Sequence, residues 1–236
     1  MEAGNPFGNG PGFSRNRGGS RSGGRGQRAS RWPRSDGGPR AARLSADDID
    51  ALFAAVGRVR FVAFDFETTG LSSASDRIVE IGAVGFRLEE GEAGWRAVVD
   101  GTYETLVNPG RPIPPEVTAI HGIDDLSVSG APAFREAAME FLPFIEGSIL
   151  VAHNAPFDLG FLAAETARAG IDNPPNPAYD TIAIAKTAVS GLPSYSLKAL
   201  AASFGIDQTA AHRGADDARV CMKLFSRCIN LINTSK

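Results

Sequence analysis

The sequence predicts an α/β domain built on a β-sheet of mixed direction, preceded by a basic, glycine-rich segment. Two observations support this fold class. Apolar runs typical of strands come first, and a further strand then alternates with segments of helical spacing. The length is a third observation, because 236 residues with 43% hydrophobic content suffice for one sizeable domain and an additional segment. We therefore expect a tail at 1–43 and a folded domain at 44–236.

The tail differs from the rest of the chain in composition. It contains nine arginines, no lysine, two acids and 11 of the 27 glycines, so its net charge is +7 while the remainder carries −10. With so few large aliphatic side chains, it cannot bury enough surface to offset its ordering entropy, and we expect disorder. Its Arg-Gly-Gly pieces at 17–19 and 23–26 resemble segments that bind single-stranded nucleic acid. A solubilising tail is the alternative, and a transit peptide fits the glycine content less well.

In the first half of the domain, the residue pattern predicts one helix followed by an antiparallel meander. Ser45 can cap the helix with Asp48 as its acidic partner, and Gly57 can end it. The first strand is apolar throughout until Asp65, which is typical of a central strand buried on both faces. The predicted strands lie at 61–66, 77–88 and 95–107, with a glycine-containing turn at 89–94 and a proline-rich loop at 108–115.

Helical spacing dominates the second half. One helix covers 134–142, and Pro143 is expected to end or kink it. A short apolar strand at 148–152 follows, and Asn154 can then cap a helix that runs to about Gly170. The remaining predicted helices lie at about 180–189, 196–204 and 215–232.

Two features bear on the compartment. No apolar run approaches the roughly 18 residues needed to span a membrane, and the N-terminus lacks the layout of a secretory signal. Cys221 and Cys228 lie two helical turns apart, about 10.5 Å along the axis, which is too far for a disulfide. We expect both to be buried, reduced thiols. Together these features predict a cytoplasmic protein that has no membrane partner.

Acids and histidines recur in three separated blocks, FDFETTG at 64–70, HNAPFD at 153–158 and HRGADDA at 212–218. In the first block, Asp65 and Glu67 are two apart on a predicted strand, so both side chains point to the same face. Adjacent carboxylates at the end of a buried strand are costly unless a cation or a donor compensates them. The alternative is that the strand has already reached the surface and that water solvates both.

Asp158 and Asp217 fall in the first turns of two predicted helices. Unpaired N–H groups and the helix dipole favour an acid there, so each has a structural explanation by itself. His212 lies five residues before Asp217, and the two can face a common point only if His212 lies in the loop before the helix, where Gly214 gives freedom. Four carboxylates converging on one point would raise each other's pKa unless a cation sat among them. Two carboxylate-bound Mg²⁺ or Mn²⁺ ions suit phosphodiester hydrolysis.

The three blocks resemble the exonuclease motifs of the DEDDh family, 3′→5′ exonucleases that include proofreading subunits of bacterial replicative polymerases, RNase T and oligoribonuclease. The segments AIHGI at 119–123 and YSLKALAASFGI at 195–206 are also similar to the family, and the resemblance covers about 60–229. Arg213 stands where the sister class has a tyrosine, so the chain resembles the histidine branch. The resemblance implies an RNase H-like fold, a five-stranded mixed sheet flanked by helices.

The resemblance also implies a role for each matching residue. It makes the four carboxylates the ligands of two divalent metal ions, Mg²⁺ or Mn²⁺, and it makes His212 the general base for the attacking water. The implied metal ligands are Asp65, Glu67, Asp158 and Asp217. The implied substrate contacts are Thr68, Thr69 and Gly70 at the terminal 3′-hydroxyl, Leu71, Ile120 and His121 at the last base, and Phe157 at the next nucleotide.

Two of the implied substrate contacts, and one further histidine, could have a purely structural role. His121 could be an ordinary loop histidine, and Phe157 could belong to the core. His153, which the resemblance leaves without a role, is expected to be a structural residue at a strand end. Asp216 has no role that the resemblance supplies.

Together these residues predict a two-metal 3′→5′ exonuclease that releases nucleoside 5′-monophosphates from single-stranded ends, with DNA favoured over RNA. The expected partners are single-stranded DNA or RNA 3′ ends and, as an option, a DNA polymerase; the oligomeric state is open. The alternatives are a proofreading subunit of a replicative polymerase and a catalytically silent nucleic-acid-binding module. The polymerase-binding C-terminal segment that proofreading subunits of the family often carry has no counterpart after the last predicted helix, which favours a stand-alone or differently tethered nuclease. The intact set of five site residues disfavours a silent module.

Overall fold

The computed structural model describes residues 42–208 and 213–234. Their strands are β1 (Phe61–Thr68), β2 (Ile78–Gly91), β3 (Gly94–Leu106), β4 (Ile149–Ala152) and β5 (Ala178–Asp180). Their helices are α1 (Ala46–Ala55), α2 (Pro115–His121), α3 (Asp125–Val128), α4 (Phe134–Ile145), α5 (Ala155–Ala169), α6 (Thr181–Ala188), α7 (Leu197–Ser203) and α8 (Gly214–Thr234). Apart from its last two residues, the predicted tail at 1–43 lies outside the described residues, so its disorder stays a prediction.

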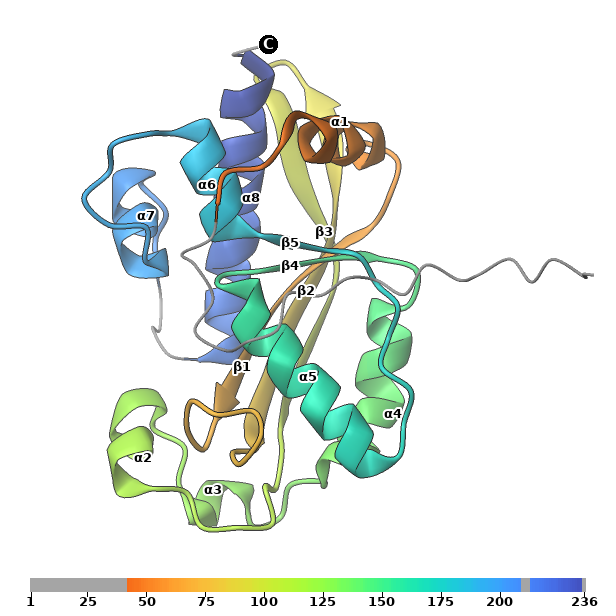
Figure 1. The fold of residues 1–236 in the computed structure, drawn as a ribbon, viewed down its shortest axis with the longest axis vertical. Helices are drawn as coiled ribbons and strands as arrows, with labels where there is room; N and C mark the ends of the chain where they lie inside the picture. The colour runs from red at the N-terminus through yellow and green to blue at the C-terminus, as the bar shows by residue number, and fades with distance from the viewer. Residues whose placement is uncertain (1–41, 209–212, 235–236) are drawn as a thin grey trace, which may run out of the picture.

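The strands form one five-stranded sheet in the order β3-β2-β1-β4-β5 (Figure 1). The pairs β1–β2 and β2–β3 are antiparallel, whereas β1–β4 and β4–β5 are parallel. The predicted mixed sheet flanked by helices is therefore confirmed. Among the described residues, no helix is both long and apolar enough to cross a membrane.

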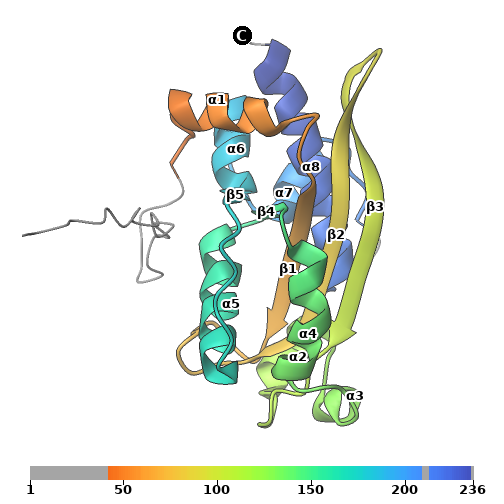
Figure 2. The same cartoon turned by 90° about the vertical axis from the view of Figure 1, so that its right-hand side faces the viewer.

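β1 lies between two apolar layers. Because side chains alternate along a strand, Phe61 and Ala63 pack toward α1, α6, α7 and α8, while Phe64 and Phe66 pack toward α4 and α5. Figures 1 and 2 show these two groups of helices around the sheet. Asp65 continues the row of Phe61 and Ala63, so it faces α8, as expected from the opposite orientation of the neighbouring phenylalanines.

Several local predictions are confirmed. The predicted capping box at the start of α1 is present, because the Asp48 N–H donates to Ser45 Oγ at 3.1 Å and the Ser45 N–H donates to Asp48 Oδ2 at 3.2 Å. Cys221 and Cys228 are both buried and free, as their spacing on α8 predicted.

Two predictions about element boundaries are wrong. The turn predicted at 89–94 is much shorter, because β2 and β3 continue until Gly91 pairs with Gly94. Pro143 was expected to end or kink the helix; it does not end α4, which continues to Ile145, and the kink stays a prediction. Pro143 lies in the last turn and removes one backbone donor, and water can solvate the carbonyl of the exposed Met139 four residues earlier.

Three short elements, α2, α3 and β5, were not predicted from the sequence. α2 begins with Pro115 in its first turn and ends at Gly122, whose φ of 76° is left-handed. Proline at the start and glycine just beyond the end are a recognised helix signature, so a signal for α2 was present. β5 has only three residues and no apolar run, and only the family resemblance implied a fifth strand.

Candidate functional site

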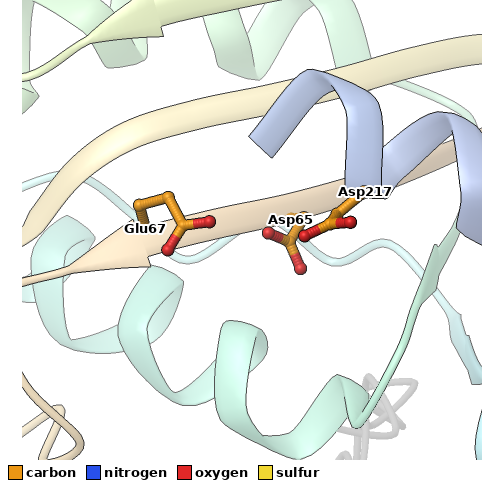
Figure 3. Close-up of side chains that lie close together, drawn as sticks. All are labelled: Asp65, Glu67 and Asp217. Atoms are coloured by element: carbon orange, nitrogen blue, oxygen red, sulfur yellow. The ribbon is translucent and has the colours of Figure 1, made fainter. Parts of the chain in front are cut away.

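Three of the four predicted carboxylates meet at the C-terminal end of β1. Asp65 and Glu67 leave the same face of β1, and Asp217 comes from the first turn of α8 (Figure 3). One carboxylate oxygen from each residue lies within 4.8 Å of the other two. Hard oxygen ligands at this spacing suit a divalent cation such as Mg²⁺ or Mn²⁺.

Two glycines allow α8 to come this close to the sheet. A Cβ atom on Gly82 would lie 1.9 Å from the carbonyl carbon of Gly214, and one on Gly214 would lie 3.2 Å from the backbone oxygen of Asp65. A side chain at Gly82 would therefore displace the start of the helix. Gly214 was expected to give freedom to the loop before the helix. It is instead the first residue of α8, and its lack of a side chain permits the close approach to the sheet.

Asp158 approaches β1 at its open edge. β1 pairs with β4 only from Phe61 to Ala63, so backbone groups further along β1 have no strand partner on that side. Asp158, in the first turn of α5, occupies this edge, and its Oδ1 accepts a hydrogen bond from the Phe66 N–H at 3.1 Å. Asp158 is buried and lies outside the group of three whose oxygens fall within 4.8 Å. It is therefore close to the site but also anchors α5 to β1.

The turn that leads into α5 differs from the prediction. Asn154 is at the N-cap position as predicted, but its side chain makes no capping hydrogen bond, and its φ of 66° is left-handed. Asparagine tolerates that conformation better than most residues. The carboxylate of Asp180 supports the turn instead, because its Oδ1 accepts the Asn154 N–H at 3.1 Å and the Ile182 N–H at 2.9 Å.

Burial and mutual repulsion raise the pKa values of the clustered acids. Burial first, and then the charges of Asp158 and Glu67, hold the pKa of Asp65 well above its usual range. Burial, and then the charges of Glu80 and Asp217, raise the pKa of Glu67 to about 7. Burial also raises the pKa of Asp158 well above its usual range. A bound cation would favour the ionised carboxylates, so the donor set fits a divalent metal.

His212, the predicted general base, lies outside the described residues. The next described residue is Arg213, whose guanidinium donates to Glu80 Oε1 from Nε at 3.2 Å and from Nη2 at 3.0 Å. The Gly214 N–H donates to Glu80 Oε2 at 2.8 Å. Glu80 lies between the first and second motifs and was not among the residues predicted for the site. A signal was available, because Glu80 is the one charged residue in the apolar run 78–86 and a buried carboxylate needs partners.

The predicted substrate contacts at the end of β1, on the loop that follows it and at the end of α2 fall into two kinds. Leu71 is 87% exposed, and Ile120 at the end of α2 is 59% exposed, so both apolar side chains are accessible to a base. Thr68 and Thr69 are buried. Thr68 Oγ1 donates to the Gly70 carbonyl at 2.6 Å, which fixes the backbone of this loop.

The two remaining contacts and His153 are more enclosed. His121 is not a loop histidine: it is the last residue of α2, its ring is buried, and Nδ1 accepts the Ile123 N–H at 3.0 Å. It therefore supports the turn after α2 and does not offer an open ring face. Phe157 is partly buried against Phe161, with ring centroids 4.9 Å apart. His153 Nδ1 lies 2.8 Å from the Thr181 hydroxyl, and burial lowers the pKa of His153 to about 4, in keeping with a structural role.

Known proteins are similar to this chain over most of its domain. Residues 62–225, which span all three motif blocks, match the sequence profile of the family described as Exonuclease. The chain is 43% identical over 182 residues to DNA polymerase III subunit epsilon of Treponema pallidum, covering 76% of this chain and 81% of that protein. It is 41% identical over 175 residues to the DNA polymerase III subunit epsilon-like protein of Rhodobacter capsulatus, covering 73% of this chain but 24% of that protein.

A solved structure with related sequence shares the fold. It is Exonuclease X in complex with 5′ overhanging duplex DNA, which superposes with a TM-score of 0.53 at 28% identity. The match covers 75% of this chain and 92% of that one.

Proposed function

The chain belongs to the exonuclease family and is a hydrolytic nuclease, and on that premise we propose that it removes nucleotides from the 3′ end of single-stranded DNA with two divalent metal ions. The observation that carries the proposal is the convergence of Asp65, Glu67 and Asp217, whose carboxylate oxygens lie within 4.8 Å of one another. Raised pKa values at Asp65 and Glu67 support it, because such a cluster is at odds with solvated strand-end acids and suits a cation.

The metal ligands would come from three elements. Asp65 and Glu67 on β1 and Asp217 on α8 would hold the ions from two sides, and Asp158 would approach from the start of α5. Bound Mg²⁺ or Mn²⁺ would supply activation of a water and stabilisation of the leaving 3′ oxygen. His212 would take the proton from that water, the role that the family resemblance gives it.

The substrate would contact exposed apolar side chains on the loop after β1 and on α2. Leu71 and Ile120 are accessible for packing against the terminal base. The backbone of 68–70, held by the Thr68 hydroxyl, would bind the terminal 3′-hydroxyl. Phe157 keeps part of its surface exposed and could contact the next nucleotide, whereas the buried His121 would shape the turn that carries Ile120.

Digestion of end-labelled oligonucleotides tests the proposal. With Mg²⁺ or Mn²⁺, 5′-labelled single-stranded DNA should give a ladder that shortens from its 3′ end and releases nucleoside 5′-monophosphates. A chelator or the Asp65→Asn substitution should stop the reaction. Early release of the 5′ label as a mononucleotide, or cleavage that persists in chelator, would contradict the proposal. Matched RNA oligonucleotides determine the sugar preference.

A second candidate function is proofreading as a subunit of a replicative polymerase. The observation that favours it is the 43% identity to a protein named DNA polymerase III subunit epsilon, over 81% of that protein's length. Co-purification of the tagged chain with the replicative polymerase would support this assignment. A chain that degrades DNA but copurifies without polymerase subunits would be a stand-alone nuclease.

A further inference from the structure

Glu80 is a buried acid that the proposed mechanism does not use. It lies within β2, opposite Glu67 on β1 in the strand register, and its exposure is 0%. A carboxylate in such a position is strongly unfavourable unless charged and hydrogen-bonding partners compensate it. Its partners therefore indicate what the residue does.

Within the described part of the chain, the hydrogen bonds to Glu80's carboxylate come from the start of α8. Arg213 donates twice to Oε1, at 3.2 and 3.0 Å, and the Gly214 N–H donates to Oε2 at 2.8 Å. The Arg213 carbonyl in turn accepts the Asp217 N–H at 2.9 Å, so the residue that Glu80 holds also bonds to the backbone of the first turn of α8. Arg213 reaches Glu104 on β3 as well, at 3.3 Å, which ties the same point to a second strand.

The position of Asp217 follows from this anchor. Asp217 is three residues after Gly214, within one helical turn, so a shift of the helix start shifts its carboxylate by a similar amount. The close contact between Gly82 and Gly214 prevents α8 from moving further toward the sheet, and the bonds to Glu80 prevent it from moving away.

We propose that Glu80 is a positioning residue for the metal site: by holding Arg213 and Gly214, it places Asp217 at the spacing from Asp65 and Glu67 that a divalent ion requires. This inference rests on the proposed metal site. An ion pair that only stabilises the fold would not influence metal affinity. Residues that hydrogen-bond to metal ligands or position them influence both metal affinity and folding, and Glu80 is expected to do the same.

The chain offers a matched control in Glu165 on α5. The side chains of Glu80 and Glu165 are each 1% exposed, and each is held by two bonds from one arginine. Arg77 donates to Glu165 at 2.6 and 3.0 Å, and the Ile78 N–H donates to it at 3.4 Å. Glu165 therefore resembles Glu80 in burial and in its paired arginine bonds, and it has a further ion pair with Arg168 on its own helix at 3.3 Å. Its bonds tie α5 to the start of β2 and do not reach α8, and Asp158 on α5 keeps its own bond to the Phe66 N–H.

The test measures Mn²⁺ affinity by electron paramagnetic resonance in the full chain carrying Glu80→Gln or Glu165→Gln. We expect Glu80→Gln to weaken Mn²⁺ binding by about tenfold and to lower kcat with little change in KM for DNA. Glu165→Gln should lower the melting temperature comparably and leave Mn²⁺ affinity unchanged. Equal Mn²⁺ affinity in Glu80→Gln and the wild type would overturn the inference while leaving the metal site in place. A wild type that binds no Mn²⁺ would overturn both.

A second variant separates position from charge and also serves if Glu80→Gln fails to fold. Arg213→Lys keeps the positive charge at a half-exposed position but replaces the two-bonded contact to Glu80 with a single donor. If Glu80 acts by position, this variant should fold and weaken Mn²⁺ binding by about threefold or more. Wild-type affinity in Arg213→Lys would mean that the anchor geometry does not set the metal site.

Discussion

The two helices that bring acids to the proposed metal site, α5 and α8, are attached to the sheet in different ways. At α5 the candidate ligand is itself one of the anchors, because Asp158 accepts the Phe66 N–H at the open edge of β1, while Glu165 further along the helix bonds to Arg77. α8 is held by Glu80 through Arg213 and Gly214, none of which is a candidate ligand. The comparison shows that metal binding and anchoring share one residue at α5 and are divided among several at α8. Substitutions should separate the two tasks at α8 only.

The largest expected effect comes from removing the candidate ligand on α8. Asp217→Asn should reduce hydrolysis by at least about a thousandfold, because one oxygen donor and one negative charge leave the cluster. Digestion of labelled single-stranded DNA under single-turnover conditions measures the loss. Activity within tenfold of the wild type would remove Asp217 from the proposed ligand set.

The next effect concerns pH and metal. Glu67 is neutral in the folded and unfolded states below about pH 4.5; as pH rises, the unfolded chain ionises first, so the metal-free fold loses stability up to about pH 7. For Glu67 alone the loss is on the order of 3 kcal/mol for a pKa raised from 4.5 to about 7, and Asp65 adds in the same direction. Mn²⁺ should therefore raise the melting temperature more at pH 8 than at pH 5. Equal stabilisation by Mn²⁺ at both pH values would contradict the account that ionisation of the buried acids destabilises the metal-free fold.

A smaller effect tests the double task of Asp158. Asp158→Asn and Asp158→Ala should both lose hydrolysis, but only the alanine variant should also lose about 1–3 kcal/mol of unfolding free energy, because it leaves the buried Phe66 N–H without its acceptor. The asparagine oxygen can still accept that hydrogen bond. Urea unfolding of the two metal-free variants measures the difference. Equal stabilities would show that Asp158 does not anchor α5.

The smallest effect lies outside both helices, in the basic tail. Removing residues 1–43 should leave kcat unchanged and flatten the dependence of log affinity on log salt by about 0.7 for each phosphate that the tail neutralises in the full chain. An unchanged slope would assign the tail to solubility. Binding of labelled single-stranded DNA at several salt concentrations gives the slope.

The difference between α5 and α8 also explains how far the sequence could predict this site. Strand alternation is a local property, so the shared face of Asp65 and Glu67 follows from their spacing. The convergence of Asp158 depends on where β4 ends beside β1, and that of Asp217 depends on the contact between two glycines remote in sequence, Gly82 and Gly214. Neither is visible in local periodicity, and the family resemblance supplied both.

Glu80 escaped prediction for the same reason. Its partners, Arg213 and Gly214, are 133 and 134 residues away along the chain. The fold itself was easier to predict from the sequence, because long apolar runs and capping signals mark the longer elements. The missed elements α2, α3 and β5 have seven, four and three residues, too few for periodicity to identify.

Crystals grown with Mn²⁺ and a nucleoside 5′-monophosphate would test the central claim most directly. Anomalous diffraction should show two Mn²⁺ peaks among the carboxylates of Asp65, Glu67, Asp158 and Asp217, and Asp65→Asn should abolish or weaken them. Anomalous density that lies elsewhere, or an acid cluster that stays empty at saturating Mn²⁺, would contradict a metal-dependent nuclease site at the end of β1.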